Sequence, residues 1–99
     1  MNIATVTFTS PVNKENSFNQ WSLGEHESTM ELGIKDSDHT QGWIEWNIPS
    51  ADEYAEIGLW FGTDGKTLTD YDGVFALPDQ AIKLLRDNGF IVGEEFEND

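Results

Sequence analysis

The chain has 99 residues, a length that suits one domain and not two. Its nineteen Asp and Glu outnumber five Lys and Arg, and the resulting net charge of −14 excludes direct binding to nucleic acid or to an anionic membrane. The absence of cysteine excludes disulfides and cysteine-based metal or redox sites.

The first half of the chain predicts three strands. Apolar and polar side chains alternate over residues 3–8, 27–35 and 42–48, as they do in strands with one buried face. In the third segment Trp46 is expected to face inward, whereas Trp43 shares the opposite face with Glu45.

The segments that follow predict a helical turn and a hairpin. Ser50 and Glu53 have the spacing of a capping box, which predicts a short helical turn. Residues 56–61 and 66–75 predict a fourth and a fifth strand, and the GTDG sequence between them is typical of a hairpin turn.

One helix is expected near the end of the chain, over residues 78–88. Pro78 suits a first helical turn, and Gly89 suits a C-terminal cap. A short last strand in the FIV sequence and an acidic tail over about 93–99 complete the chain. The expected fold is therefore a single α+β domain, 1–99, with an antiparallel sheet of about 4–6 short strands and the helix packed on one face.

The hairpin segment GTDGKTLTDYDG has the glycines and aspartates of several ligand-binding loops. An EF-hand loop aligned on Gly73 would place Leu68 at its first ligand position, which excludes that motif. A phosphate site is excluded because Lys66 is the single cation among three aspartates. A weaker cation site at Asp70 and Asp72 stays open, since both side chains are expected on one side of a strand.

The sequence contains no motif for other catalytic or cofactor-binding sites. His26 and His39 lie at opposite ends of the predicted second strand, roughly 30 Å apart, which is too far for a shared zinc ion. No nucleophile motif is present, and a domain of this size with one short helix rarely forms a deep pocket. We therefore expect a protein that is not an enzyme and has no cofactor.

Exposed carboxylates and tryptophans are the remaining candidates for function. The carboxylates are expected on the hairpin and on the polar face of the sheet, with Trp43 as an apolar anchor: Asp64, Asp70, Asp72, Glu31, Glu45, Glu53, Glu56 and Trp43. Two simpler interpretations stay open, because aspartates commonly occupy turns and because Trp43 and Trp60 could be core residues beneath a loop.

The chain resembles the small phage-encoded inhibitors of bacterial defence, the anti-CRISPR proteins and the DNA-mimicking restriction inhibitors. The resemblance lies in the short, cysteine-free, strongly acidic chain and in the segment DYDGVFALPDQAIKLLRDNGF, which is similar to a cassette of small phage proteins. These inhibitors share no diagnostic motif, so the resemblance assigns a role to no single residue. It implies an inhibitor acting in the cytoplasm of a host cell.

The sequence thus predicts a non-enzymatic inhibitor that binds the basic nucleic-acid-binding surface of another protein, such as a CRISPR effector or a restriction enzyme. Its carboxylates would replace phosphates in ion pairs with Lys and Arg, and so block access to DNA. The alternative is a phage-type carbohydrate- or protein-binding module that uses exposed tryptophans. The N-terminal sequence MNIATVTFTS shows no signal peptide, and no stretch has the ~18 apolar residues of a membrane span, which predicts a cytoplasmic location.

Overall fold

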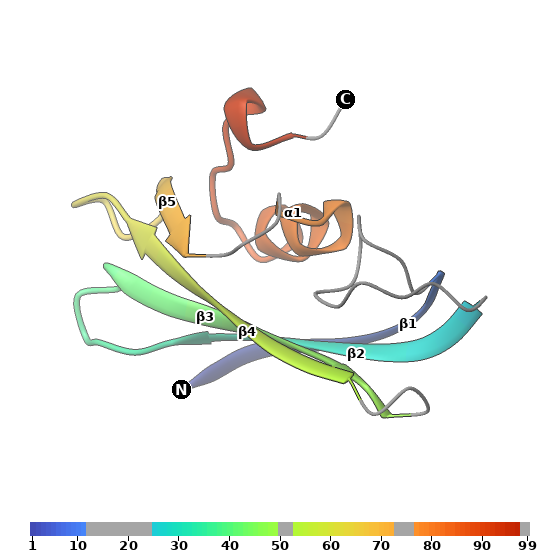
Figure 1. Cartoon of the computed structure of the whole chain (residues 1–99). Coiled ribbons are helices and arrows are strands. Elements are labelled where there is room, and N and C mark those ends of the chain that lie inside the picture. Colours follow the sequence, from blue (N-terminus) through green and yellow to red (C-terminus); the bar gives the residue numbers. More distant parts are fainter. Residues whose placement is uncertain (12–24, 50–52, 73–76, 98–99) are drawn as a thin grey trace.

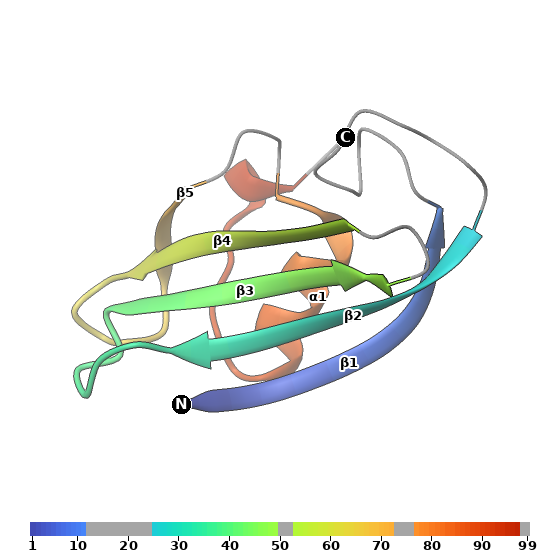
Figure 2. The same cartoon turned by 60° about the horizontal axis from the view of Figure 1, so that its bottom comes forward.

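The fold is an antiparallel sheet covered on one face by a single helix. The computed structural model describes residues 1–11, 25–49, 53–72 and 77–97. The strands are β1 (Asn2–Pro11), β2 (Glu25–Ile34), β3 (Gln41–Ile48), β4 (Glu53–Phe61) and β5 (Leu68–Asp72). They lie in the order β1-β2-β3-β4-β5, and each pairs antiparallel with its neighbour in the sequence (Figures 1 and 2). The expected α+β class with an antiparallel sheet and one helix is confirmed, although strands dominate.

The alternation of the strands separates a buried face from a polar one. The buried apolar side chains described in β2, β3 and β4 are Met30, Leu32, Ile34, Ile44, Trp46, Ile57, Leu59 and Phe61. They lie beneath the helix because successive residues of a strand point to opposite faces and these share one parity. The inward position expected for Trp46 is confirmed, since that side chain is 1% exposed.

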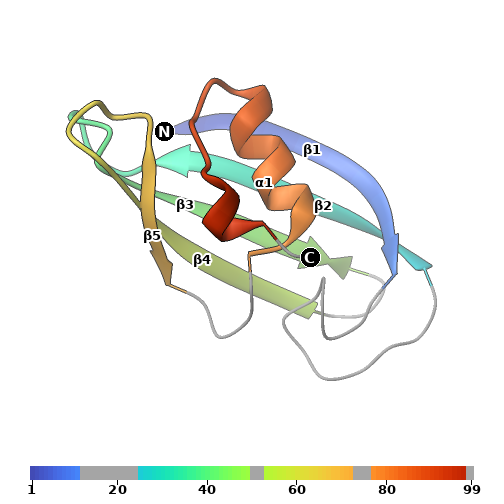
Figure 3. The same cartoon turned by 90° about the horizontal axis from the view of Figure 1, so that it is seen from above.

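Helix α1 (Asp79–Asp87) supplies the other half of the core. Its buried residues are Ala81, Ile82, Leu84 and Leu85, and Figure 3 shows it lying over one face of the sheet. Pro78 directly precedes the helix with an extended backbone, and Gly89 follows it with φ of 87°, a left-handed conformation that glycine adopts without strain. These are the residues that predicted the helix from the sequence.

The segment after α1 returns to the β4–β5 hairpin. Phe90 stacks on Phe61 with ring centroids 4.8 Å apart. The Leu68 amide donates to the Ile91 carbonyl, and the Ile91 amide donates to the Lys66 carbonyl, both at 2.9 Å. The expected last strand is thus reduced to one parallel bridge, after which comes the short 3-10 helix η2 (Glu94–Phe96).

The short helical turn expected from Ser50 and Glu53 falls mostly on residues 50–52, which lie outside the described residues. Of its flanks, Pro49 has 3-10 helical geometry, whereas Glu53 is the first residue of β4 and pairs with Ile48. Within the described part of the chain, no helix has the length and apolar character needed to cross a membrane.

Candidate functional site

The candidate site is the face of the sheet that α1 leaves uncovered, which we call the open face (Figure 2). Strand parity and register place a set of polar and aromatic side chains on it, among them Thr5, Thr7, Glu27, Thr29, Glu31, Trp43, Glu45, Tyr54, Glu56, Trp60, Asp70 and Asp72. None of the five strands contains a lysine or an arginine. The open face is therefore acidic and aromatic, with no cation within its strands.

Three glutamates form a row across the middle of the open face. The register pairs Glu31 with Glu45 and Glu45 with Glu56, so the three lie directly opposite one another on β2, β3 and β4. Directly opposed residues have Cα atoms only about 4.5–5.5 Å apart, and like charges at that separation repel. The side-chain amide of Asn2 donates a hydrogen bond to Glu31 at one end of the row.

The electrostatics of the row appear in two pKa shifts. Burial raises the pKa of Glu45, and the adjacent carboxylates of Glu31 and Glu56 raise it further. The pKa of Tyr54 is also raised, first by burial and then by the three glutamates. The carboxylates of the row thus repel one another, and a bound cationic group would reduce this repulsion.

Two tryptophans of the open face each contact a glycine of a strand. The Trp43 indole covers Gly33, where an added Cβ would lie 2.1 Å from the ring. The Trp60 ring lies over Gly58, at 3.4 Å from such a Cβ. Covering an exposed glycine with a ring is a known way of stabilising a sheet.

The two tryptophans differ in exposure. Trp60 is 39% exposed, whereas Trp43 is half-buried and its Nε1 has no hydrogen-bond partner among the described residues. Trp60 is the better candidate for contact with a partner, although the sequence singled out Trp43. Both lie on the open face, as strand alternation predicted.

Asp70 and Asp72 extend the acidic surface to the β5 side of the open face. Asp70 lies opposite Trp60 and Asp72 lies opposite Gly58, and both aspartates are exposed. The Asp70 carboxylate accepts the Tyr71 amide at 2.8 Å, and the Asp72 Cβ approaches Gly58. The strand geometry separates their Cα atoms by about 6–7 Å.

Asp64 lies away from this surface, in the hairpin turn. Its carboxylate accepts hydrogen bonds from the hydroxyl of Thr67 at 2.5 Å and from the amides of Thr67 and Lys66 at 2.9 Å. These bonds, the Thr67 hydroxyl first, lower the pKa of Asp64 to about 2. The carboxylate therefore has a structural role in the turn, and less of it is free for a partner.

The remaining candidate is Glu53, whose side chain lies outside the described residues. Its backbone begins β4 and pairs with Ile48. The other six of the eight sequence candidates lie on the open face.

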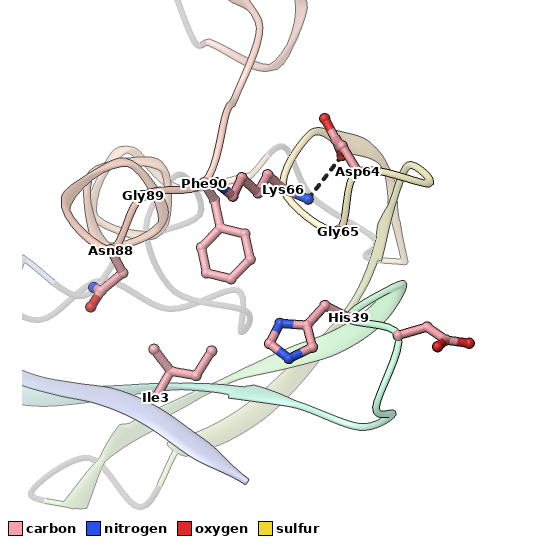
Figure 4. A pocket seen from close by; sticks show the side chains of 9 residues that line it. Ile3, His39, Asp64, Gly65, Lys66, Asn88, Gly89 and Phe90 are labelled. Carbon is pink, nitrogen blue, oxygen red and sulfur yellow. Dashed lines mark hydrogen bonds between the residues drawn. The ribbon is translucent and has the colours of Figure 1, made fainter.

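A cavity of about 420 Å³ lies at the hairpin end of the molecule, and no motif in the sequence predicts it (Figure 4). Its lining comes from the β2–β3 turn with His39, from the hairpin turn with Lys66, and from Ile3 and Phe90. Three left-handed residues shape its walls: His39, Gly65 and Gly89. Glycine marks turns in a sequence, but the convergence of three turns depends on tertiary structure.

Metal binding gains no support from the part of the chain that the structure describes. No group of three or more His, Asp or Glu side chains there is arranged to hold a metal ion. The cation site left open at Asp70 and Asp72 therefore has two carboxylates on a strand and no third ligand of these types. Divalent cations such as Ca²⁺ need six to eight oxygen ligands.

Comparison with protein-family models, with curated proteins and with solved structures finds no match to this chain. The functional argument therefore depends on the geometry and charge of the open face.

Proposed function

We propose that the protein is a non-enzymatic inhibitor whose open face binds a basic, nucleic-acid-binding surface of another protein. The observation that supports this most strongly is the gathering of six described carboxylates on one face: the row Glu31, Glu45 and Glu56, the pair Asp70 and Asp72, and Glu27. No basic side chain within the strands neutralises them. A cationic partner would relieve the repulsion within the row and form charge-assisted hydrogen bonds.

The layout of the carboxylates suits a surface that otherwise binds phosphates. Neighbouring strands repeat about every 4.8 Å and alternate residues of one strand about every 6–7 Å, so the face offers charges in two directions on a stiff support. Phosphates repeat at comparable intervals along a nucleic-acid strand, about 7 Å apart along its backbone. The partner class we propose includes CRISPR effectors and restriction enzymes, whose access to DNA would be blocked.

The test begins with affinity capture from a bacterial lysate at low salt, with elution in a salt gradient and identification of the partner by mass. Binding to the identified partner is then measured against ionic strength and in competition with DNA. We expect the affinity to fall steeply as salt rises and DNA to compete. Affinity that stays flat between low and high salt would contradict phosphate mimicry.

Paired charge reversals locate the binding surface. Asp70→Lys with Asp72→Lys should weaken binding at least tenfold, because both charges lie on the open face. Glu94→Lys with Glu95→Lys makes the same change in net charge on η2, away from the strands. Equal weakening by the two double variants would show that net charge alone matters and that the open face is not the site.

The exposed aromatic residues support a second candidate, a carbohydrate- or protein-binding module. Trp60 is 39% exposed and Tyr54 is 60% exposed on the same face. A flat, accessible ring beside carboxylates can stack on a sugar or anchor a protein contact. In this case Trp60→Ala or Trp43→Ala would abolish binding to a glycan array or to the captured partner, and the Asp70 and Asp72 reversals would have little effect.

A further inference from the structure

The two outer strands of the sheet differ in how well they are protected against pairing with another strand. β5 is five residues long, carries Asp70 and Asp72, and has a register shift where it meets β4. β1 is ten residues long and has no charged side chain, and its pairing with β2 is regular from Ala4 to Pro11. Natural edge strands are usually short, charged, bulged or interrupted by proline, and the centre of β1 is none of these.

The hydrogen-bond pattern shows which backbone groups of β1 point outward. Met1 and Ile34 exchange two hydrogen bonds of 2.9 Å, so Ile34 directs its amide and carbonyl toward β1. In an antiparallel ladder these bonds recur at every second residue. Leu32 therefore also points toward β1, and its partner Ala4 points back toward β2.

It follows that the alternate residues of β1, Thr5 and Thr7, direct their backbone amides and carbonyls away from the sheet. β1 is the first strand in the sheet order, so no described strand lies beyond it to accept these groups (Figure 3). Both threonine side chains are exposed. This edge offers two donors and two acceptors to an incoming strand.

The surface beside this edge is apolar and electrically neutral. A groove of about 210 Å³ runs between β1 and α1, with Val6 on one wall and Leu84 on the other. Val6 is 37% exposed. The charged side chains of the groove are Lys83 and Asp87, which pair with each other at 2.6 Å.

We propose that two copies of this chain associate through β1, antiparallel about a two-fold axis at Val6, so that one sheet runs through both. Residues with outward backbone groups must face each other, which places Thr5 opposite Thr7 of the second copy. Val6 then lies against Val6 of the second copy and covers the apolar groove. Threonine–threonine pairs and paired β-branched residues are favourable cross-strand neighbours.

The charge distribution is the reason for choosing a second copy as the occupant. With a net charge of −14, two copies repel each other over most approaches. The β1 edge is uncharged, and its flank carries a neutral ion pair, so a copy can approach there at small electrostatic cost. Every copy also supplies the same open edge, which a two-fold interface requires. The inference is independent of the function proposed for the open face.

Cysteine substitution tests the association and its register, because the natural chain has no cysteine. Val6→Cys should form an intermolecular disulfide on mild oxidation, since the axis brings the two Cα atoms to about 4.5 Å, within disulfide range. Ala4→Cys is the matched control, because that residue would face Phe8 of the second copy and not itself. Cross-linking of Ala4→Cys as efficient as that of Val6→Cys would overturn the proposal.

Sedimentation equilibrium over a concentration series tests the association without a cross-link. The natural chain should show twice the monomer mass, and Thr7→Pro should remain a monomer. Proline removes an outward amide and leaves the bonds to β2, so the variant should fold. Thr7→Val, which keeps the amide, should still dimerise.

Two outcomes would overturn the inference. One is a natural chain that is monomeric throughout the series, and the other is a dimer that persists in Thr7→Pro. Circular dichroism reports whether Thr7→Pro is folded. If it is not, Thr7→Glu replaces it, since a further negative charge beside the axis would add to the repulsion between two acidic copies and should also give a monomer.

Discussion

Glu45 is the residue on which the repulsion within the open face converges. It lies between Glu31 and Glu56, and its pKa is raised above the ordinary value. A carboxyl group with a raised folded pKa holds its proton more tightly in the folded protein than in the unfolded chain. Its effect on stability is therefore most unfavourable above the raised pKa and is relieved as the pH falls through that value.

Replacing Glu45 by glutamine should stabilise the protein at neutral pH. We expect the free energy of unfolding to rise by about 0.5 kcal/mol near pH ~7, because two like-charge pairs across the strands disappear. The gain should shrink toward zero as the pH falls to about 3, because this lies below the ordinary glutamate pKa of about 4.3 and the natural carboxyl group, whose pKa is raised, is then protonated. Urea unfolding at the two pH values measures both quantities.

Glu27→Gln is the matched control for this prediction. Glu27 is exposed and has the same parity on β2, but its register partner is Thr9 and not a carboxylate. The control makes the same change in charge without removing a directly opposed pair. An equal gain from both substitutions would attribute the effect to net charge and remove the special role of the row.

At the scale of the strands, Trp43 and Gly33 show how one residue fixes the packing of two neighbouring elements. The indole of β3 lies on the backbone of β2, in space that any side chain at Gly33 would fill. Gly58 makes a similar contact with Trp60, but there the ring is 3.4 Å from the position of an added Cβ. The two glycines thus allow a comparison between a site with no space for a Cβ atom and a site where a Cβ atom would make an ordinary contact.

Gly33→Ala should destabilise the sheet, by about 1–3 kcal/mol, because overpacking forces the indole away from the strand. The emission of Trp43 should shift to longer wavelength as the ring becomes exposed. Gly58→Ala should change stability by less than about 1 kcal/mol, since the added methyl makes an ordinary contact. Thermal unfolding and tryptophan fluorescence measure the effects of the two substitutions. Equal effects would contradict the interpretation that the indole of Trp43 occupies the space at Gly33.

The strands also show how far the sequence predicts this site. Alternation alone places Trp43 and Glu45 on one face, because side chains of a strand point to opposite sides in turn. It could not predict that Glu31 lies opposite Glu45, since register is set by pairing between strands and by the turns that join them.

Some local details also depended on tertiary structure. Glu53 was assigned to a helical turn by its capping-box spacing with Ser50, and at this residue strand pairing overrides that local preference. Asp64 lies exposed in the hairpin turn as expected, but the sequence alone could not predict that its carboxylate accepts hydrogen bonds from Thr67. The helix was predictable because Pro78 and Gly89 mark its ends in the sequence itself.

For the molecule as a whole, the net charge of −14 opposes the compact state. The structure shows two ion pairs among the described residues, Lys83 with Asp87 and Arg86 with Glu97, and both are exposed. Exposed pairs contribute little to stability. Most of the carboxylates are therefore balanced by solvent ions and not by the protein.

Salt should consequently act in opposite directions on folding and on the binding we propose. Raising NaCl from about 0.01 M to about 0.5 M shortens the Debye length from ~30 Å to under 10 Å and should raise the melting temperature by several degrees. The same change should weaken binding to a basic partner. Calorimetry in NaCl, with sucrose as a control that does not screen charge, measures the first effect, and a melting temperature that falls with NaCl would contradict it.

The paired hydrogen bonds between Ile91 and the hairpin close a loop that contains the whole of α1. The helix is thereby tethered at both ends, to β5 before it and to the same hairpin after it. Separation of α1 from the sheet must therefore also break contacts of β5, the last strand of the sheet. We expect the helix and the five strands to unfold in one cooperative step.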